Sequence, residues 1–385
     1  MQIERWRREF RDCEEIIHLN HAGASPVPTR VVRAVTSLIE QATRSAPGGH
    51  IAREQSMEAT RSGFARLIGA ASQEIAFVTN TSHGLSLIAT AMPWRAGDNV
   101  VAIEGDYPAN VYPWWGQRRF GVETRMVPPR NRRFGVDAIR AAVDARTRVI
   151  AVSAVDWQTG FRCDLGALGS FCRERGVLFC VDGIQAVGAL EVNVERDGVD
   201  CLAAGGHKWL LAPHGCGALY VSPRIVEQMQ PVVLGWNSVV DPESFLPYHF
   251  DLRSDAARFE PGTHPYLGIA ALGAAIELLH EVGVAAIEAR VLDLTAQLAE
   301  GLRERGAEIL SPWGRRERSG ILTVRLGDGP DRLVAALQAH NIICRVRAGG
   351  VRLAPHFYLS TGDVTRFFTV LDDIRRQMET AARTR

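Results

Sequence analysis

The 44 basic residues of this chain include a single lysine, Lys208, and all the others are arginines. A chain that uses arginine wherever a positive charge is needed keeps a lysine for a task that a guanidinium cannot perform. A lysine amine can lose its proton when it is buried or lies near other cations, and it can then add to a carbonyl group. Lys208 follows two glycines and a histidine after an apolar run (residues 203–209, AAGGHKW), which indicates an active-site turn.

A nucleophilic lysine raises the question of pyridoxal phosphate, a cofactor whose aldehyde forms a Schiff base with such an amine. The cofactor also needs a carboxylate beside its pyridine nitrogen, a helix N-terminus for its phosphate and a flat group against its ring. Asp182 ends the apolar run VLFCV and precedes Lys208 by one strand–helix unit, so it is a candidate for the carboxylate. Thr81 and Ser82 follow a strand-like run and open a helix, where hydroxyl residues are more often plain caps than phosphate ligands.

Strand and helix patterns alternate through the middle of the chain and predict a mainly parallel sheet covered on both faces. The predicted strands are residues 74–79, 99–103, 148–155, 177–181, 199–204 and 217–221, and the predicted helices are residues 82–92 and 164–175, the second with Gly176 as its stop. Ligands of such sheets bind beyond the carboxyl ends of the strands. Trp157, Asp182 and Lys208 lie at or just after such ends, so we expect them to converge on one site.

The pattern changes after residue 282, where a compact α+β unit follows a long predicted helix over residues 261–282. This unit has predicted helices at residues 284–305, 331–340 and 364–382 and predicted strands at residues 320–326 and 342–346. We therefore divide the chain into three parts. An N-terminal segment (1–30) joins the small domain and borders the active site, a large domain (31–282) carries the lysine site, and a small domain (283–385) ends the chain.

Composition excludes several classes of function. Hydrophobic content is 46%, charged content is 23% and the formal net charge is +1, so no global field points to nucleic acid or to a membrane surface. We find neither a long apolar segment nor a signal pattern, and we expect a cytoplasmic protein with a small-molecule substrate. Seven cysteines without CxxC spacing disfavour a disulfide framework and a zinc site, and we expect no metal. No GxGxxG follows an early strand, which makes a Rossmann dehydrogenase a poor alternative.

These motifs resemble those of the class V aminotransferase family of fold type I pyridoxal-phosphate enzymes, which includes cysteine desulfurases, kynureninases and isopenicillin N epimerase-like proteins. The D-x-x-Q and G-H-K pair is the specific part, and looser matches lie at residues 18–23 (HLNHAG), 258–263 (RFEPGT) and 351–355 (VRLAP). The resemblance covers nearly the whole chain. It implies an α/β fold with a mainly parallel seven-stranded sheet in the large domain, a smaller α+β C-terminal domain, and pyridoxal 5'-phosphate as cofactor.

The resemblance also implies a role for each matching residue. Lys208 would hold the cofactor and carry the proton at the substrate α-carbon, and Asp182 would pair with the pyridinium nitrogen. Arg352 would clamp the substrate α-carboxylate, a bidentate task that suits a guanidinium. The other implied contacts are Gln185 to the ring phenolate oxygen, Thr81, Ser82 and His207 to the phosphate, Tyr107 and Trp157 beside the ring, Thr263 to the phosphate from the second subunit of a homodimer, and Asn20, His21 and Ala22 at the border of the substrate pocket.

The chain departs from the cysteine desulfurases that it resembles in two places. The loop cysteine that precedes the carboxylate-binding arginine in those enzymes is missing from the short stretch 345–352 (RVRAGGVR). Cys344 falls within an apolar strand, where a thiol is inert. Trp157 stands where an asparagine often touches the ring oxygen. Persulfide-forming desulfuration is therefore disfavoured.

The lysine chemistry leaves several reactions open. Protonation at the cofactor carbon gives transamination, loss of a β-substituent gives lyase chemistry, and return of the proton to the α-carbon gives epimerisation. We rank aminotransferase-type chemistry first and a C–S or other β-lyase second. Epimerisation is third, because it needs a second acid on the opposite ring face and none is evident. A cofactor-binding accessory protein is the non-enzyme alternative, and the joint presence of Lys208, Asp182 and Arg352 argues against it.

Overall fold

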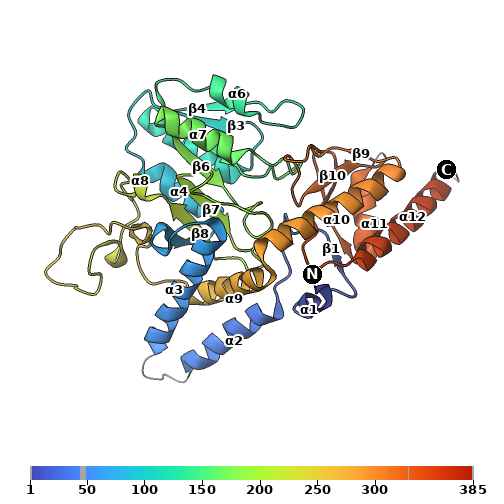
Figure 1. The fold of residues 1–385 in the computed structure, drawn as a ribbon, viewed down its shortest axis with the longest axis horizontal. Coiled ribbons are helices and arrows are strands. Elements are labelled where there is room, and N and C mark those ends of the chain that lie inside the picture. Colours follow the sequence, from blue (N-terminus) through green and yellow to red (C-terminus); the bar gives the residue numbers. More distant parts are fainter. Residues whose placement is uncertain (1, 44–48, 328, 384–385) are drawn as a thin grey trace.

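A seven-stranded sheet forms the centre of the computed structural model, which describes residues 2–43, 49–327 and 329–383. The strand order is β2-β8-β7-β6-β5-β3-β4 (Figure 1). Neighbours from β7 to β4 are parallel, and β8 runs antiparallel to both β7 and β2, so the predicted mainly parallel seven-stranded sheet is confirmed. The strands are β2 (Ile75–Val78), β3 (Asn99–Ile103), β4 (Glu123–Val127), β5 (Thr147–Ser153), β6 (Leu178–Asp182), β7 (Cys201–Gly205) and β8 (Gly217–Val221).

Helices cover both faces of this sheet because its strands are apolar on both sides. One face packs against α3 (Gly49–Ile68), α7 (Leu165–Arg175) and α9 (Tyr266–Val282), and the other against α4 (Thr81–Ala91), α5 (Tyr112–Trp115) and α8 (Pro223–Val226). In β7, Leu202 and Ala204 belong to the first core, and Cys201 and Ala203 belong to the second. The alternation of side chains along a strand thus builds two hydrophobic layers from one uninterrupted apolar run.

Most predicted elements of the sheet region agree with the structure, and the differences have local causes. The Asp164 side chain caps α7 by accepting a hydrogen bond from the N–H of Ala167, and Gly176 ends it with a φ of 65°. Helix α9 begins at Tyr266 and not at residue 261, because Pro261, Gly262 and Pro265 keep that stretch in a loop. The sequence did not predict β4, α2 (Thr29–Thr43) or α3.

The C-terminal unit contains a four-stranded antiparallel sheet with the order β12-β13-β10-β9. Its strands are β9 (Glu308–Ile309), β10 (Leu322–Arg325), β12 (Arg345–Arg347) and β13 (Gly350–Leu353), and its helices are α10 (Val284–Glu304), α11 (Pro330–Ala339) and α12 (Thr361–Arg383). The predicted strand at residues 342–346 is divided at Cys344 into β11 (Ile342–Ile343) and β12, and β13 was not predicted. These differences matter because the hairpin of β12 and β13 reaches the site described below.

The N-terminal segment adds to this C-terminal unit. Strand β1 (Ile17–His18) pairs in parallel with β11, and Asn20 forms an isolated bridge with Ala354. Helices α9 and α10 meet at Gly283, whose φ is 86°, and are bent by 80°. The domain boundary predicted after residue 282 falls at this bend and stays a prediction. The remaining elements are α1 (Ile3–Arg7), α6 (Val136–Ala141), η1 (Ser72–Glu74), η2 (Pro108–Asn110), η3 (Gly116–Phe120), η4 (Trp236–Ser238) and η5 (Ala256–Phe259).

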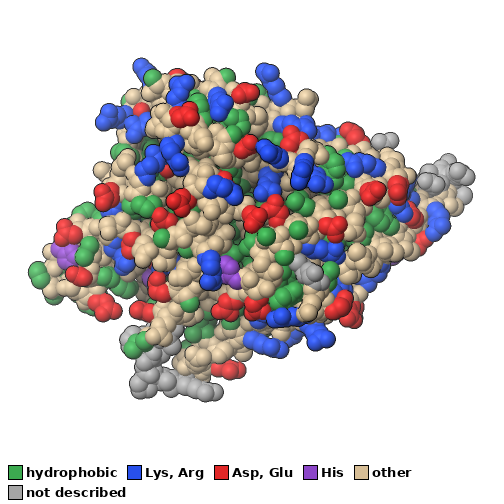
Figure 2. Space-filling view, in the orientation of Figure 1, with side chains coloured by type: hydrophobic (Ala, Val, Ile, Leu, Met, Phe, Trp, Pro, Cys, Tyr) green, Lys and Arg blue, Asp and Glu red, His purple; other side chains and the backbone are tan. Residues whose placement is uncertain are grey.

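Charged side chains of both signs are interspersed over the face shown in Figure 2, in keeping with the formal net charge of +1. Within the described residues, no single helix has the length and the apolar character of a membrane span. The bent pair of α9 and α10 passes that test only when the two helices are taken together.

Candidate active site

A cavity of about 250 Å³ lies at the carboxyl ends of the parallel strands and contains most of the residues predicted from the sequence. Asp182 lies at the end of β6, and Lys208 follows the end of β7. The first turn of α4 also lines the cavity, and the β12–β13 hairpin of the C-terminal unit contributes its arginines. The predicted residues that line the cavity are Ala22, Thr81, Ser82, Tyr107, Trp157, Asp182, Gln185, His207, Lys208 and Arg352. The site therefore assembles from parts of the chain that are far apart in sequence.

Lys208 is held in a turn after β7 by its backbone. A Cβ atom on Gly206 would come within 2.9 Å of both Cys216 O and Ala212 Cβ, so this close turn requires glycine. Ser25 donates from its N–H to His207 O (2.9 Å) and from its Oγ to Lys208 O (2.5 Å). The Lys208 side chain is 7% exposed. The N-terminal segment thus clamps the backbone that presents the amine.

The surroundings of Lys208 shift its amine towards the neutral form. Burial lowers the pKa of Lys208, and the positive charges of Arg352 and Arg347 lower it further, while the carboxylate of Asp182 acts in the opposite direction. A lysine with a lowered pKa carries more of the free base at neutral pH, and the free base is the nucleophile and the proton acceptor.

Asp182 is a buried carboxylate with one oxygen free to act on a ligand. Its Oδ1 accepts a hydrogen bond from the N–H of Ile184 (2.9 Å), and no described residue donates to its Oδ2. Burial raises the pKa of Asp182, and the nearby charge of Asp106 raises it further. Asp106 itself accepts hydrogen bonds from Ser153 Oγ (2.6 Å) and Asn110 Nδ2 (3.0 Å). A cationic N–H group in the cavity would offset the cost of this buried charge.

The first turn of α4 lines the cavity. A Cβ atom on Gly84 would come within 2.9 Å of Ala203 Cβ, so glycine lets α4 rest directly on β7. Asn80 caps the helix by accepting from the N–H of His83 (2.9 Å), and Thr81 Oγ1 accepts from the N–H of Gly205 (2.9 Å). The N–H groups of Thr81 and Ser82 have no acceptor inside the helix, which makes this turn suitable for an anion.

His207 lies beside this turn and is uncharged at neutral pH. Its ring stacks on the His214 ring with a centroid distance of 4.5 Å. Burial lowers the pKa of His207 to about 4, together with the charges of Lys208 and His214. A neutral imidazole can donate one hydrogen bond to an anion without adding a second cation next to the lysine.

Two aromatic side chains and a glutamine surround the space in front of Lys208. The amine lies 5.3 Å from the centroid of the Tyr107 ring, and Trp157 meets that ring edge to face at 5.5 Å. Gln185 donates from Nε2 to Ala22 O (3.0 Å) and accepts from Trp209 Nε1 (2.8 Å). These two contacts fix the amide orientation and leave it one N–H for a ligand.

Arg352 enters from β13 and is 2% exposed. Its Nη1 donates to Trp157 O (2.6 Å) and its Nη2 to Asn20 Oδ1 (3.2 Å), while its Nε has no partner among the described residues. Burial and the charges of Arg347 and Arg345 lower the pKa of Arg352 to about 10, which leaves it protonated at neutral pH. A buried cation whose partners are neutral oxygen atoms is suited to bind an anion.

Three predicted residues do not line this cavity. Asn20 reaches it only through Arg352. His21 is fully buried, with Nδ1 bonded to Ala354 O (2.8 Å) and Nε2 to Tyr358 Oη (3.0 Å). Thr263 lines a different cavity of about 670 Å³. The cofactor and substrate contacts expected of these residues stay predictions.

Sequence reasoning missed Arg347 and Asn80, which also line the Lys208 cavity. The signal for Asn80 was available, since asparagine before Thr81-Ser82 is a good N-cap. Arg347 required recognition of the hairpin turn at Ala348-Gly349, which returns the chain beside it. The other additional lining residues are Gly23, Ala109 and Ile184.

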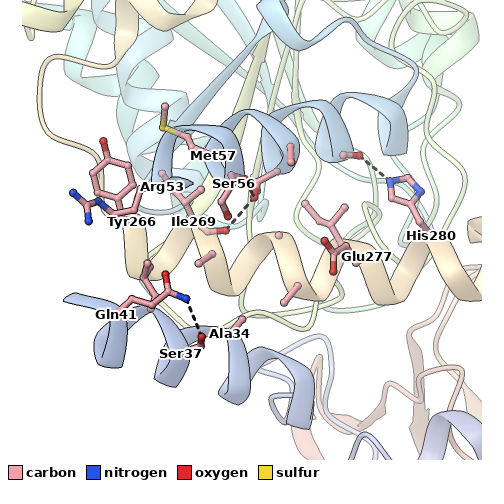
Figure 3. Close-up of a pocket in the computed structure, with 18 of the residues that line it drawn as sticks. Ala34, Ser37, Gln41, Arg53, Ser56, Met57, Tyr266, Ile269, Glu277 and His280 are labelled. Atoms are coloured by element: carbon pink, nitrogen blue, oxygen red, sulfur yellow. Dashed lines mark hydrogen bonds between the residues drawn. The ribbon is translucent and has the colours of Figure 1, made fainter. Parts of the chain in front are cut away.

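A cavity of about 560 Å³ between α2, α3 and α9 has no comparable set of groups (Figure 3). Its labelled polar side chains mostly pair locally, as in the hydrogen bond from Gln41 Nε2 to Ser37 Oγ (3.1 Å) and that of His280 with Gly63 O (2.9 Å). Its lining holds neither the lysine nor a buried carboxylate. Size alone therefore does not make it the active site.

None of the cysteines, and no metal-binding cluster of described residues, lies at the Lys208 cavity. All seven cysteines lie in the described part of the chain, all are buried, and none lines the cavity. Burial raises the pKa of Cys344 to about 12. Within residues 2–43, 49–327 and 329–383, no group of three or more His, Cys, Asp or Glu side chains could hold a metal ion.

Comparisons with known proteins agree with this geometry. The family model described as "Aminotransferase class-V" matches residues 17–367. A "Probable cysteine desulfurase" of Methanothermobacter thermautotrophicus is 31% identical over 77% of this chain and 75% of the relative. The isopenicillin N epimerase of Streptomyces clavuligerus is 28% identical over 93% of this chain and 94% of that protein.

Solved structures share the fold across almost the whole chain. The apo structure of a cysteine desulfurase from Thermococcus onnurineus NA1 has a TM-score of 0.88 at 24% identity and covers 96% of this chain and 97% of its own. A mutant of C-DES with glycine covalently linked to the PLP cofactor has a TM-score of 0.87 at 21% identity, with 95% and 99% of the two chains covered.

Proposed function

Since this chain belongs to the class-V aminotransferase family and is an enzyme that uses pyridoxal 5'-phosphate, we propose that it catalyses an aminotransferase-type reaction on an amino acid at the Lys208 cavity. When bound, the cofactor withdraws electrons from the substrate α-carbon and makes its C–H bond acidic. The residues of the chain must then hold the cofactor, orient the amino acid and move one proton.

The residues around the cavity fit the cofactor. The Lys208 amine would hold its aldehyde carbon, and the free Oδ2 of Asp182 would accept from the pyridine N–H. The first turn of α4 and the neutral His207 would receive the phosphate. The remaining contacts would be Tyr107 and Trp157 beside the ring, the second amide N–H of Gln185 to the ring oxygen, the hydroxyls of Thr81 and Ser82 to the phosphate, and Thr263 to the phosphate of a partner subunit.

Arg352 and Lys208 would act on the substrate itself. Arg352 would bind the α-carboxylate, and Asn20 would orient its guanidinium. Ala22 would border the bound substrate, with His21 behind it. The Lys208 amine would take the α-proton and return it at a neighbouring carbon on the same face, which one base of lowered pKa can do.

One observation carries this proposal: Asp182, Lys208 and Arg352 converge, all buried, on a single cavity of about 250 Å³. A buried carboxylate, amine and guanidinium are costly to desolvate, so their convergence indicates function. Epimerisation would need a second acid besides Lys208, whereas transamination needs only the one base. Desulfuration through a protein persulfide would need a cysteine in the cavity, and none of the seven lies there.

A β-lyase is the second candidate. The relative that is 31% identical bears the name of a cysteine desulfurase, and a solved structure with a TM-score of 0.85 is the cystine C-S lyase C-DES with its product cysteine persulfide. A β-elimination that releases its sulfur product into solution needs no thiol on the protein, so the buried thiols of this chain do not exclude it.

Product analysis separates the two reactions. The holoenzyme is incubated with single amino acids, with and without an added 2-oxo acid. An aminotransferase forms one oxo acid per site without an acceptor and turns over repeatedly only when the acceptor is present. Continuous release of ammonia and an oxo acid without an acceptor would instead identify a lyase. The Lys208→Ala protein is the control, and turnover by it at the normal rate would refute the assignment of the lysine.

A further inference from the structure

Arg347 is a second guanidinium on the Lys208 cavity, and it has no assigned role. We propose that it binds a second acidic group on the substrate, so that the enzyme acts on dicarboxylic amino acids. This inference rests on the function proposed above, and it names the substrate class of the same site. Its basis is the placement of two arginines by one hairpin and their lack of acidic partners.

The β12–β13 hairpin puts both arginines on one face. Arg345 lies opposite Arg352 in the antiparallel register, and Arg347 lies opposite Gly350. Arg347 and Arg352 are therefore diagonal neighbours, a spacing of roughly 7–8 Å between strands. Both side chains line the Lys208 cavity, whereas Arg345 is exposed and does not. One end of the cavity is thus framed by two guanidinium groups.

Neither guanidinium forms an ion pair with a carboxylate among the described residues, and the charge of Asp156 acts on Arg352 only from beyond ion-pair distance. Arg352 bonds to Trp157 O and Asn20 Oδ1, and Arg347 donates from Nη1 to Val346 O (2.7 Å). The Nε atoms of both are buried without a hydrogen-bond partner among the described residues. Two buried arginines elsewhere in the chain differ from the half-buried Arg347 and the buried Arg352, because Arg7 pairs with Asp363 and Arg61 pairs with Glu260. Two cations in a shielded cavity call for two anionic groups.

Trp157 contacts both Arg347 and Arg352. The Arg347 guanidinium lies 5.5 Å from the centroid of the Trp157 ring, and the carbonyl of the same residue accepts from Arg352. A guanidinium that lies over an aromatic ring keeps N–H groups available for a carboxylate. An amino acid with a neutral side chain would occupy Arg352 with its α-carboxylate and leave Arg347 unpaired. Aspartate and glutamate can satisfy both.

Kinetics with matched substrates test the inference. We expect the holoenzyme to have a higher kcat/KM for L-aspartate or L-glutamate than for L-asparagine and L-glutamine. Arg347→Gln should lower kcat/KM for the acidic substrate by about 10- to 100-fold more than for the amides, the cost of one charged hydrogen-bonding partner, because any effect on Lys208 is common to both substrates. Arg345→Gln removes the same charge from the same strand outside the cavity and is the control. Equal losses for acids and amides in Arg347→Gln would overturn the proposal.

Binding without turnover gives an independent readout. Succinate should raise the melting temperature of the holoenzyme more than its monoamide, succinamate, and Arg347→Gln should abolish the difference. If neutral amino acids turn over as well as acidic ones and succinate binds no better than succinamate, this inference fails and the proposed function stands. If succinate binding depends on Arg347 but no amino acid reacts, the proposed function fails and the dianion site stands.

Discussion

Lys208 combines burial with two neighbouring cations, and this combination lowers the pKa of its amine. Desolvation disfavours the ammonium form, and Arg352 and Arg347 repel it. The opposing Asp182 is too weak to cancel them. Lys208, which stands out in the sequence as the single lysine, is thus also the residue whose surroundings make its amine more nucleophilic.

Because Lys208 is the only lysine, its titration can be followed without interference from other side chains. We expect an amine pKa below 10.5 in the cofactor-free protein. Arg347→Gln and Arg352→Gln should each raise that pKa, since each removes a positive charge that opposes protonation. Reductive ¹³C-methylation and NMR over a pH series measure it, with the α-amino group as the other signal. An unchanged pKa in both variants would contradict the electrostatic account.

Asp182→Asn should keep the shape of the site and lose its charge. Without a carboxylate opposite the pyridine nitrogen, kcat/KM should fall by about 100-fold or more, as on loss of other groups that stabilise charge in a buried site. Steady-state rates measure this loss, and cofactor content after denaturation shows whether the variant still binds pyridoxal phosphate. A fully loaded Asn variant with the normal rate would disprove the role of the carboxylate.

At the scale of elements, the site depends on residues that lie outside the cavity. The N-terminal segment holds the turn after β7 through Ser25, while His356, next to the β13 end, bonds to Trp209 O (3.1 Å). Three successive carbonyls, those of residues 207–209, are therefore held by groups from the two ends of the chain.

Ser25→Ala should loosen this turn. It removes one of two donors to the Lys208 carbonyl, which still accepts from the N–H of Leu211 (3.0 Å), so we expect a cost of about 0.5–1.5 kcal/mol. We expect a lower kcat with little change in KM, because the amine is misplaced while Arg352 is intact, and Ser25→Thr should restore the rate. Ser37→Ala in α2 removes a hydroxyl far from the site and serves as the control. A change in KM alone would show that Ser25 acts on the substrate and not on the lysine.

The loop that carries Thr263 is fixed by a buried ion pair. Glu260 is 3% exposed, forms a bidentate pair with Arg61 of α3 and accepts from the N–H of Phe77 in β2. Burial by itself would raise the pKa of Glu260, but the hydrogen bond from His264 and the charge of Arg61 lower it to about 2.

Glu260→Gln should destabilise the protein by about 3–5 kcal/mol, because Arg61 loses its buried counter-charge and keeps only the exposed Glu58. A carboxylate whose pKa is lowered on folding adds stability above the unfolded pKa of 4.5, and this stability is lost as the pH falls from there towards 2. The variant should lose that part of the acid dependence in denaturant unfolding curves. Glu58→Gln removes an exposed partner of the same arginine and should cost no more than about 1 kcal/mol.

At the scale of the whole molecule, the position of Thr263 outside the Lys208 cavity bears on assembly. The proposed contact of Thr263 with the phosphate requires a second copy of the chain. The loop before it exposes several large apolar side chains, among them Phe245 (66% exposed), Leu246 (70%), Tyr248 (90%) and Phe250 (70%). An exposed apolar patch of this kind is typical of an interface.

Mixed subunits test whether the sites are shared. Lys208→Ala removes the amine, and Thr263→Glu sets a negative charge against the phosphate, so each variant alone should be inactive. If Thr263 serves the partner subunit, a dimer of one of each contains one site with an intact lysine and an intact threonine. Activity should therefore return when the two variants are unfolded together and refolded. No recovery in mixed dimers isolated by two affinity tags would refute the shared site.

Much of the site could be predicted from the sequence because strand ends in a parallel sheet meet at one edge. Asp182 and Lys208 each follow an apolar run whose length and flanks mark it as a strand, and the two strands are neighbours in the sheet. The helix start at Thr81 has the same basis. These predictions need only local periodicity and the rule that ligands bind at the carboxyl edge.

The contacts of the C-terminal unit with the site needed the folded molecule. Asn20 and Arg352 meet across 332 residues of sequence, and Arg347 reaches the cavity only through the pairing of β12 with β13. No local pattern encodes which strand pairs with which, since register depends on packing between distant elements. The sequence by itself therefore determined the lysine, its carboxylate and the sheet that carries them, and only the tertiary structure decided that two unpaired guanidinium groups face them.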